Sequence, residues 1–169
     1  MLGLFQVTKN DNDELRDTSS GWFFRRLGAW IYDALIVMAI LMMAGGVVVA
    51  VLEALVAAGL MSYAPYQDAS DLLSSHPIWS PVYTVYLALV WIYFFVYFWT
   101  RGGQTLGMRA WKMHICTEEG HHISATQALI RLATSGFGLA NLTVLFDTKK
   151  RGFHDIWAKT KVVVLPKAN

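Results

Sequence analysis

The chain has 169 residues, of which 55% are hydrophobic and only 15% are charged, and its mean hydropathy is +0.39. An ordinary soluble domain carries about 25% charged residues. The composition therefore excludes intrinsic disorder, disfavours a freely soluble enzyme and is typical of a membrane protein. Fourteen Lys and Arg against twelve Asp and Glu give a net charge of +2. This small excess is not the strongly basic charge that is typical of a nucleic-acid-binding protein. The single cysteine, Cys116, excludes an intrachain disulfide framework.

The first apolar segment follows a polar stretch, residues 1–20, that we expect to be a solvated cytoplasmic tail without a signal peptide. Nineteen uncharged residues lie between Asp33 and Glu53. About 20 apolar residues cross a bilayer as a helix, so we predict a first spanning helix over about 22–59. Small residues recur on it every four positions and could receive the second helix or a second protomer; they are Gly46, Ala50, Ala54 and Ala58.

The second apolar segment contains 29 uncharged residues between Asp71 and Arg101, which predicts a spanning helix over about 78–100. The alternation in residues 112–116 and the turn signal at 118–120 predict a small cytoplasmic β-hairpin over about 110–123, and the run KVVV near the C-terminus predicts another short strand. A third segment, about 124–146, contains Arg131 and two glycines. It is compatible with either a single polar-lined span or a re-entrant helical segment, and a C-terminal motif follows over 147–165.

The distribution of cations predicts the orientation. The loop over 60–81 has no Lys or Arg, whereas Arg25 and Arg26 precede the first apolar core and Arg101 and Arg109 follow the second. The positive-inside rule then places the N-terminus and residues 101–122 in the cytoplasm. We expect a multi-pass protein of the bacterial inner membrane. The basic C-terminal tail favours re-entry of the third segment, and anionic lipid is expected near three of its residues: Lys149, Lys150 and Arg151.

Ionisable residues inside spanning segments are candidates for function because they are costly to insert. Arg26 and Asp33 are seven residues apart and share a helix face, with Asp33 about 10 Å deeper. The short side chain of Asp33 cannot easily reach the headgroups, so its charge needs a counter-charge, a water-filled cavity or a proton. We expect Arg131 to supply the counter-charge. Such a pair could be a static packing device, or Asp33 could be a titrating or cation-binding carboxylate. Glu53 is predicted to be an interfacial carboxylate or a second proton-accepting group.

Three stretches, RRLGAWIYD, RGGQTLGMRAWKMHI and RGFHDIWAKTKVVV, resemble the RDD family of small membrane proteins, which is named for one arginine and two aspartates. The resemblance assigns Arg26 and Asp33 to the first two of these residues and Asp155 to the third, with Asp147 as the less fitting alternative. It implies a membrane protein suspected of transport, since monovalent cation/proton antiport has been proposed for some members.

Together these observations predict an all-α integral membrane protein with two spanning helices, a third polar-lined or re-entrant segment and a small β-hairpin, its RDD-like domain covering 21–165. We expect a small transporter of H⁺ or monovalent cations, working as a homo-oligomer or with a membrane partner. Its ion path would comprise Asp33, Arg26, Asp155 and Arg131, with Glu53, Asp147 and His154 as secondary residues. The alternative is a non-transporting accessory, assembly or lipid-binding scaffold protein. No nucleophile elbow, P-loop or zinc motif is present, so we expect no enzyme activity, cofactor or metal.

Overall fold

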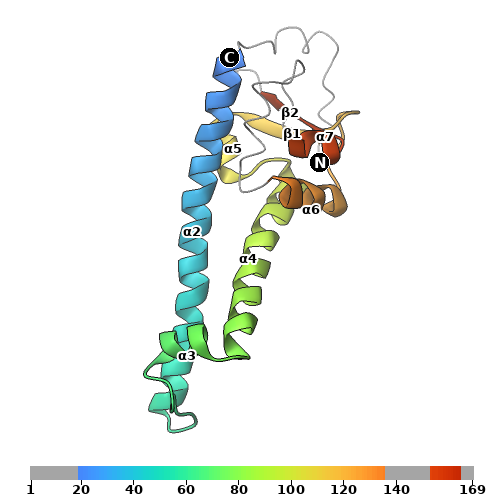
Figure 1. Ribbon diagram of the computed structural model, residues 1–169. Helices are drawn as coiled ribbons and strands as arrows, with labels where there is room; N and C mark the ends of the chain where they lie inside the picture. The colour runs from blue at the N-terminus through green and yellow to red at the C-terminus, as the bar shows by residue number, and fades with distance from the viewer. Residues whose placement is uncertain (1–18, 136–152, 165–169) are drawn as a thin grey trace. The chain divides into compact units, whose positions relative to one another are not determined.

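The computed structural model describes residues 19–135 and 153–164 (Figure 1). The chain divides into two compact units. One unit comprises residues 36–94 and is called the apolar unit here. The other comprises 1–35 and 95–169 and contains all fourteen Lys and Arg, so it is called the basic unit. The elements in chain order are α2 (Ser19–Ala57), α3 (Ala69–Ser75), α4 (Trp79–Gly102), α5 (Leu106–Ala110), β1 (Met113–Thr117), α6 (Ala125–Thr134), α7 (Phe153–Trp157) and β2 (Thr160–Val164).

The helices α2 and α4 confirm the two predicted apolar helices to within three residues at each end. Residues 23–57 of α2 and all of α4 are long and apolar enough to cross a membrane. Large apolar side chains along both helices remain exposed, for example Met42 at 72% and Tyr93 at 68%. The core helix of a soluble protein would bury such side chains, whereas a lipid environment solvates them.

The apolar unit brings the second half of α2 close to the first part of α4, but not along the predicted stripe of small residues. Gly45 is buried, and a Cβ atom there would come 2.5 Å from the hydroxyl oxygen of Tyr83. Its neighbour Gly46 is exposed, with nothing within 4 Å of such an atom, and Ala50, Ala54 and Ala58 are exposed as well. The prediction that this stripe packs against the second helix is wrong, because the close approach uses the adjacent face of α2. A role for the stripe in contacting a second protomer stays a prediction.

The basic unit contains a two-stranded sheet, but the predicted hairpin over 110–123 is wrong. β1 pairs with β2 in antiparallel register, from Met113 opposite Val164 to Thr117 opposite Thr160. The turn after β1 does form, with Gly120 at φ +91°. The chain then leads into α6, whose N-cap Ser124 exchanges hydrogen bonds with Gln127 in a capping box. A strand is disfavoured there because the capping box commits these residues to a helix start. The β-branched tail, which we predicted as a strand, takes the place beside β1.

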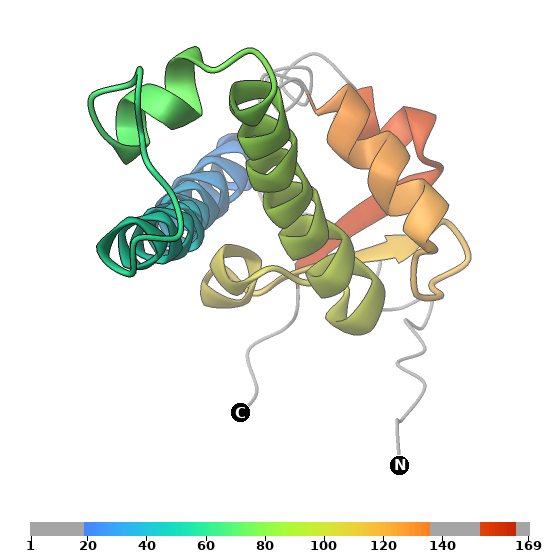
Figure 2. The ribbon, with the colours of Figure 1, turned by 90° about the horizontal axis from the view of Figure 1, so that it is seen from below.

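The helix α6 is the described part of the predicted third segment. Its ten residues span about 15 Å, which is half of the hydrocarbon core of a bilayer. The rest of that segment, residues 136–146, lies outside the described residues. α6 packs against α7, and α7 packs against β2 (Figure 2). The basic unit also buries a set of apolar residues. Those residues are Met113, Ile115, Cys116, Ile123, Ala128, Leu132 and Ala158.

Candidate functional site

One face of α2 is buried within the basic unit. Arg26, Ala29 and Asp33 lie three and four residues apart and are 5%, 2% and 6% exposed. This spacing places all three on one side of a helix. The predicted common face of Arg26 and Asp33 is therefore confirmed, and it points inward.

The Asp33 carboxylate contacts the start of α5. The backbone N–H of Gly107 donates to Oδ1 at 2.9 Å, and the hydroxyl of Thr105 donates to Oδ2. Thr105 is the N-cap of α5, and its hydroxyl oxygen accepts from the N–H of Met108 at 3.2 Å. The hydroxyl proton is thus directed at Asp33, and both carboxylate oxygens accept a hydrogen bond.

The expected ion pair between Asp33 and Arg131 is wrong. Within the ranges 19–135 and 153–164, no Lys, Arg or His nitrogen lies within 4 Å of the Asp33 carboxylate. The donors that hold it are a neutral hydroxyl and a neutral amide. Sequence reasoning included Thr105 and Gly107 in a motif but gave them no contact. The signal that could have found them is a capping threonine followed by a glycine, close to the second apolar segment.

Glycine is required on both sides of the contact between α2 and α5. A Cβ atom on Gly107 would lie 2.9 Å from Cγ and Oδ1 of Asp33 and closer still to the carbonyl oxygen of Ala29. A Cβ atom on Gly28 would overlap the indole ring of Trp111, with Nε1 at 2.9 Å. The absence of these two atoms allows the backbone of α5 to reach the carboxylate.

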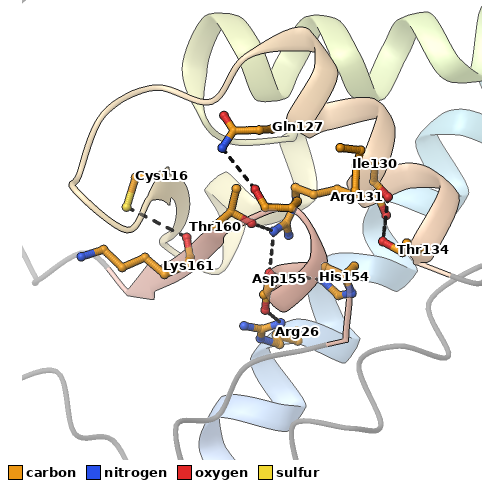
Figure 3. Close-up of polar contacts among 11 residues, drawn as sticks. Arg26, Cys116, Gln127, Ile130, Arg131, Thr134, His154, Asp155, Thr160 and Lys161 are labelled. Atoms are coloured by element: carbon orange, nitrogen blue, oxygen red, sulfur yellow. Dashed lines mark hydrogen bonds and ion pairs between the residues drawn. The ribbon is translucent and has the colours of Figure 1, made fainter.

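A second group of charges, called the arginine cluster here, comprises Arg26, Arg131, His154, Asp155 and Thr160 (Figure 3). Asp155 is 1% exposed and accepts at Oδ2 from Arg26 Nη1 at 2.8 Å and at Oδ1 from Arg131 Nη1 at 2.5 Å. The same nitrogen of Arg131 donates to the hydroxyl oxygen of Thr160. The cluster therefore joins α2, α6, α7 and β2.

Burial sets the protonation of this cluster. Burial is the main reason that the pKa of His154 falls to about 3; Asp155 opposes this change, and Arg131 and Arg26 add to it. His154 is therefore neutral at pH 7, although Nε2 lies 3.4 Å from Asp155 Oδ1. Burial also lowers the pKa of Arg131 while Asp155 opposes this change, and a guanidinium stays charged at neutral pH. The cluster thus consists of a carboxylate between two cations.

The remaining predicted residues are not part of either group. Glu53 is exposed on α2 in the apolar unit, and it follows Asp33 by twenty residues, or about 30 Å of helix. Asp147, Lys149, Lys150 and Arg151 lie outside the described residues. Among the residues that the structure describes, no three His, Cys, Asp or Glu come together in a group able to hold a metal ion.

Two apolar helices that are long enough to cross a membrane, together with a group of buried charges within the basic unit, are typical of a helical membrane protein. The RDD family model matches residues 21–159, so the chain belongs to the RDD family. This confirms the resemblance drawn from the three sequence stretches. Comparisons with curated proteins and with solved structures gave no match.

Proposed function

We propose that this RDD protein moves H⁺ or a monovalent cation across the membrane, with Asp33 as the titrating or cation-binding group. The observation that carries the proposal is a buried carboxylate on a membrane-spanning helix that has only neutral hydrogen-bond donors among the described residues. A charged side chain at the centre of a spanning helix costs about 2.5–3.5 kcal/mol on insertion scales. Binding of a proton or a monovalent cation neutralises that charge and so removes the cost. This favours Asp33 as a group that takes up and releases such an ion.

The contrast with Asp155 supports this assignment. Asp155 is equally buried, but two guanidinium groups compensate its charge. A carboxylate held in this way has no need of a proton or of a further cation. In this proposal, the ion pairs among Asp155, Arg26 and Arg131 have a structural role and exchange no ion. Arg131 does not contact Asp33.

Thr105 is suited to both states of an exchanging carboxyl group. A hydroxyl is a donor and an acceptor, so it can donate to the ionised carboxylate, which matches the hydrogen bond in the structure, and it can accept from the protonated acid. A bound cation would be held by the carboxylate oxygens together with this hydroxyl oxygen. The N–H of Gly107 fixes the carboxylate in either state.

The orientation follows from the division of charge between the two units. The apolar unit, with the loop that joins the two spans, has no Lys or Arg but three acidic residues: Glu53, Asp68 and Asp71. The positive-inside rule supports placing the N-terminus and the Lys- and Arg-rich ends of the two helices on the cytoplasmic side of the membrane, which we take to be a bacterial inner membrane. Two spans enclose little volume, which supports a path built by a homo-oligomer or with a membrane partner.

The test uses purified protein in liposomes that contain a pH-sensitive dye, with pulses of Na⁺, K⁺ and Li⁺ applied outside. We expect cation-dependent proton movement in the wild type and in the control Glu118→Gln, which removes an exposed carboxylate, and none in Asp33→Asn. The amide of Asp33→Asn still offers an oxygen to Gly107 and an N–H to the Thr105 oxygen. Silence of the wild type with all three cations, or an active Asp33→Asn, would overturn the proposal.

The second candidate is a non-transporting accessory, assembly or lipid-binding scaffold protein. The observation that favours it is the arginine cluster, which ties four elements together through compensated charges. In this case Asp33→Asn lowers protein abundance or the recovery of a partner, and no flux exists to be lost. Purification in a gentle detergent distinguishes the two candidates, because a homo-oligomer without other proteins disfavours an accessory role.

A further inference from the structure

The helix α6 buries its charged residue and exposes uncharged ones, whereas a helix on the surface of a soluble protein does the opposite. Its charged residue, Arg131, is 2% exposed. Its exposed residues are all uncharged; they are Ala125, Thr126, Leu129, Ile130 and Ala133. These positions are spaced by four residues in two adjacent rows, so they form one face of the helix. A soluble amphipathic helix turns its apolar face inward and its charges outward.

Contacts within the basic unit fix the level of this helix relative to the ends of the spans. The guanidinium of Arg131 lies over the ring of Trp99, 5.3 Å from its centroid. Trp99 is three residues, or about 4.5 Å, from the end of α4. Tryptophan is enriched at the membrane–water interface. On the other side, α7 packs against α6 and is bonded through Asp155 to Arg26, three residues after the apolar part of α2 begins. α6 therefore lies where both helices leave the hydrocarbon.

We propose that the exposed face of α6 lies in the lipid interface of the bilayer. Its occupant is lipid because the face is uncharged and is attached to the ends of two helices whose own apolar side chains are exposed. α7 adds two exposed apolar side chains, Ile156 at 45% and Trp157 at 62%, and is followed by the exposed Lys159, which suits anionic headgroups. The proposal does not depend on transport.

The test measures what surrounds this face in the full chain, reconstituted in vesicles of phosphatidylcholine and phosphatidylglycerol. Spin labels are attached to single cysteines at Leu129, Ile130 or Ala133 in a Cys116→Ser background, with Glu118→Cys as the matched control in the exposed turn before α6. Electron paramagnetic resonance then compares the access of oxygen, which partitions into lipid, with the access of a water-soluble nickel chelate.

We expect labels on α6 to be reached by oxygen far more than by the nickel chelate, and the label at position 118 to show the reverse. The label on Ala133 replaces a small exposed residue, so it keeps the test valid if the labels on Leu129 and Ile130 disturb folding. Access of the nickel chelate to α6 equal to that at position 118 would overturn the proposal. Low access of both reagents would also overturn it, because a protein partner or a second copy would then cover the face.

Discussion

The same substitution, aspartate to asparagine, is predicted to destabilise the protein strongly at Asp155 and hardly at all at Asp33. Asp155→Asn removes the carboxylate charge that contacts both Arg26 and Arg131, which are 5% and 2% exposed. Breaking a buried ion pair by removing one partner costs about 3–5 kcal/mol, because an uncompensated buried charge remains. We expect Asp155→Asn to lose stability within this range.

Asp33→Asn replaces charge-assisted hydrogen bonds from Thr105 and Gly107 by neutral ones. A bond to a charged group contributes about 1.5–3 kcal/mol and a neutral one about 0.5–1.5 kcal/mol, so two bonds lose roughly 2–3 kcal/mol. Removing an intramembrane charge returns about 2.5–3.5 kcal/mol. The two effects nearly cancel, and the stability of Asp33→Asn should stay within about 1 kcal/mol of the wild type.

The assay is unfolding of the detergent-solubilised protein at pH 7, followed by tryptophan fluorescence. Adding Arg131→Met to Asp155→Asn should restore part of the lost stability, because it removes one of the two cations that Asp155 contacts. If Asp33→Asn is as destabilising as Asp155→Asn, Asp33 has a counter-charge, and the reasoning that makes it exchangeable fails. A stable Asp155→Asn would show that the arginine cluster is not a structural device.

Three further predictions concern single positions. Gly107→Ala places a Cβ atom 2.9 Å from Asp33 Oδ1, so we expect a loss of about 1–3 kcal/mol from overpacking and a reduced flux in liposomes; an unchanged melting temperature would contradict this contact. His154 has a pKa of about 3 when folded against an ordinary value near 6.5, so the unfolded chain binds the proton first and stability falls as pH drops from about 6.5 towards 3. Linkage gives a loss of about 2 kcal/mol between pH 7 and pH 5, measured by unfolding at both values; His154→Gln should flatten that slope, and an unaltered slope would refute the assignment. Glu53→Gln should leave flux unchanged, because Glu53 is about 30 Å of helix away from Asp33, and a lost flux would place Glu53 on the path.

The long helices could be predicted from the sequence because their signal is local. Uncharged runs of nineteen and 29 residues admit few structures other than helices, and a separation of seven places Arg26 and Asp33 on one face whatever the helix packs against. The small sheet could not be predicted in the same way. β1 looks like half of a hairpin until its true partner, more than forty residues further along the chain, is known.

The partner of Asp33 was predicted wrongly for a related reason. Charge complementarity alone pointed to Arg131, but position decides the pair: α6 places Arg131 24 residues before Asp155 and beside it in space. Asp33 instead meets a backbone amide and a hydroxyl, groups that almost every turn contains and that no search for opposite charges would select. A buried carboxylate can therefore be recognised in the sequence, while the neutral groups that hold it become visible only in the fold.

The three residues that the sequence resemblance assigns to the family's arginine and two aspartates thus divide into two groups with different physical roles. Arg26 and Asp155 neutralise each other and join α2 to α7, so their variants should change stability and, through it, abundance. Asp33 is held by neutral groups and carries a charge that nothing described nearby compensates, so its variants should change flux at nearly constant stability. A single set of asparagine variants, measured for unfolding and for proton movement on the same preparations, separates these roles, because a purely structural Asp33 would move only the first quantity.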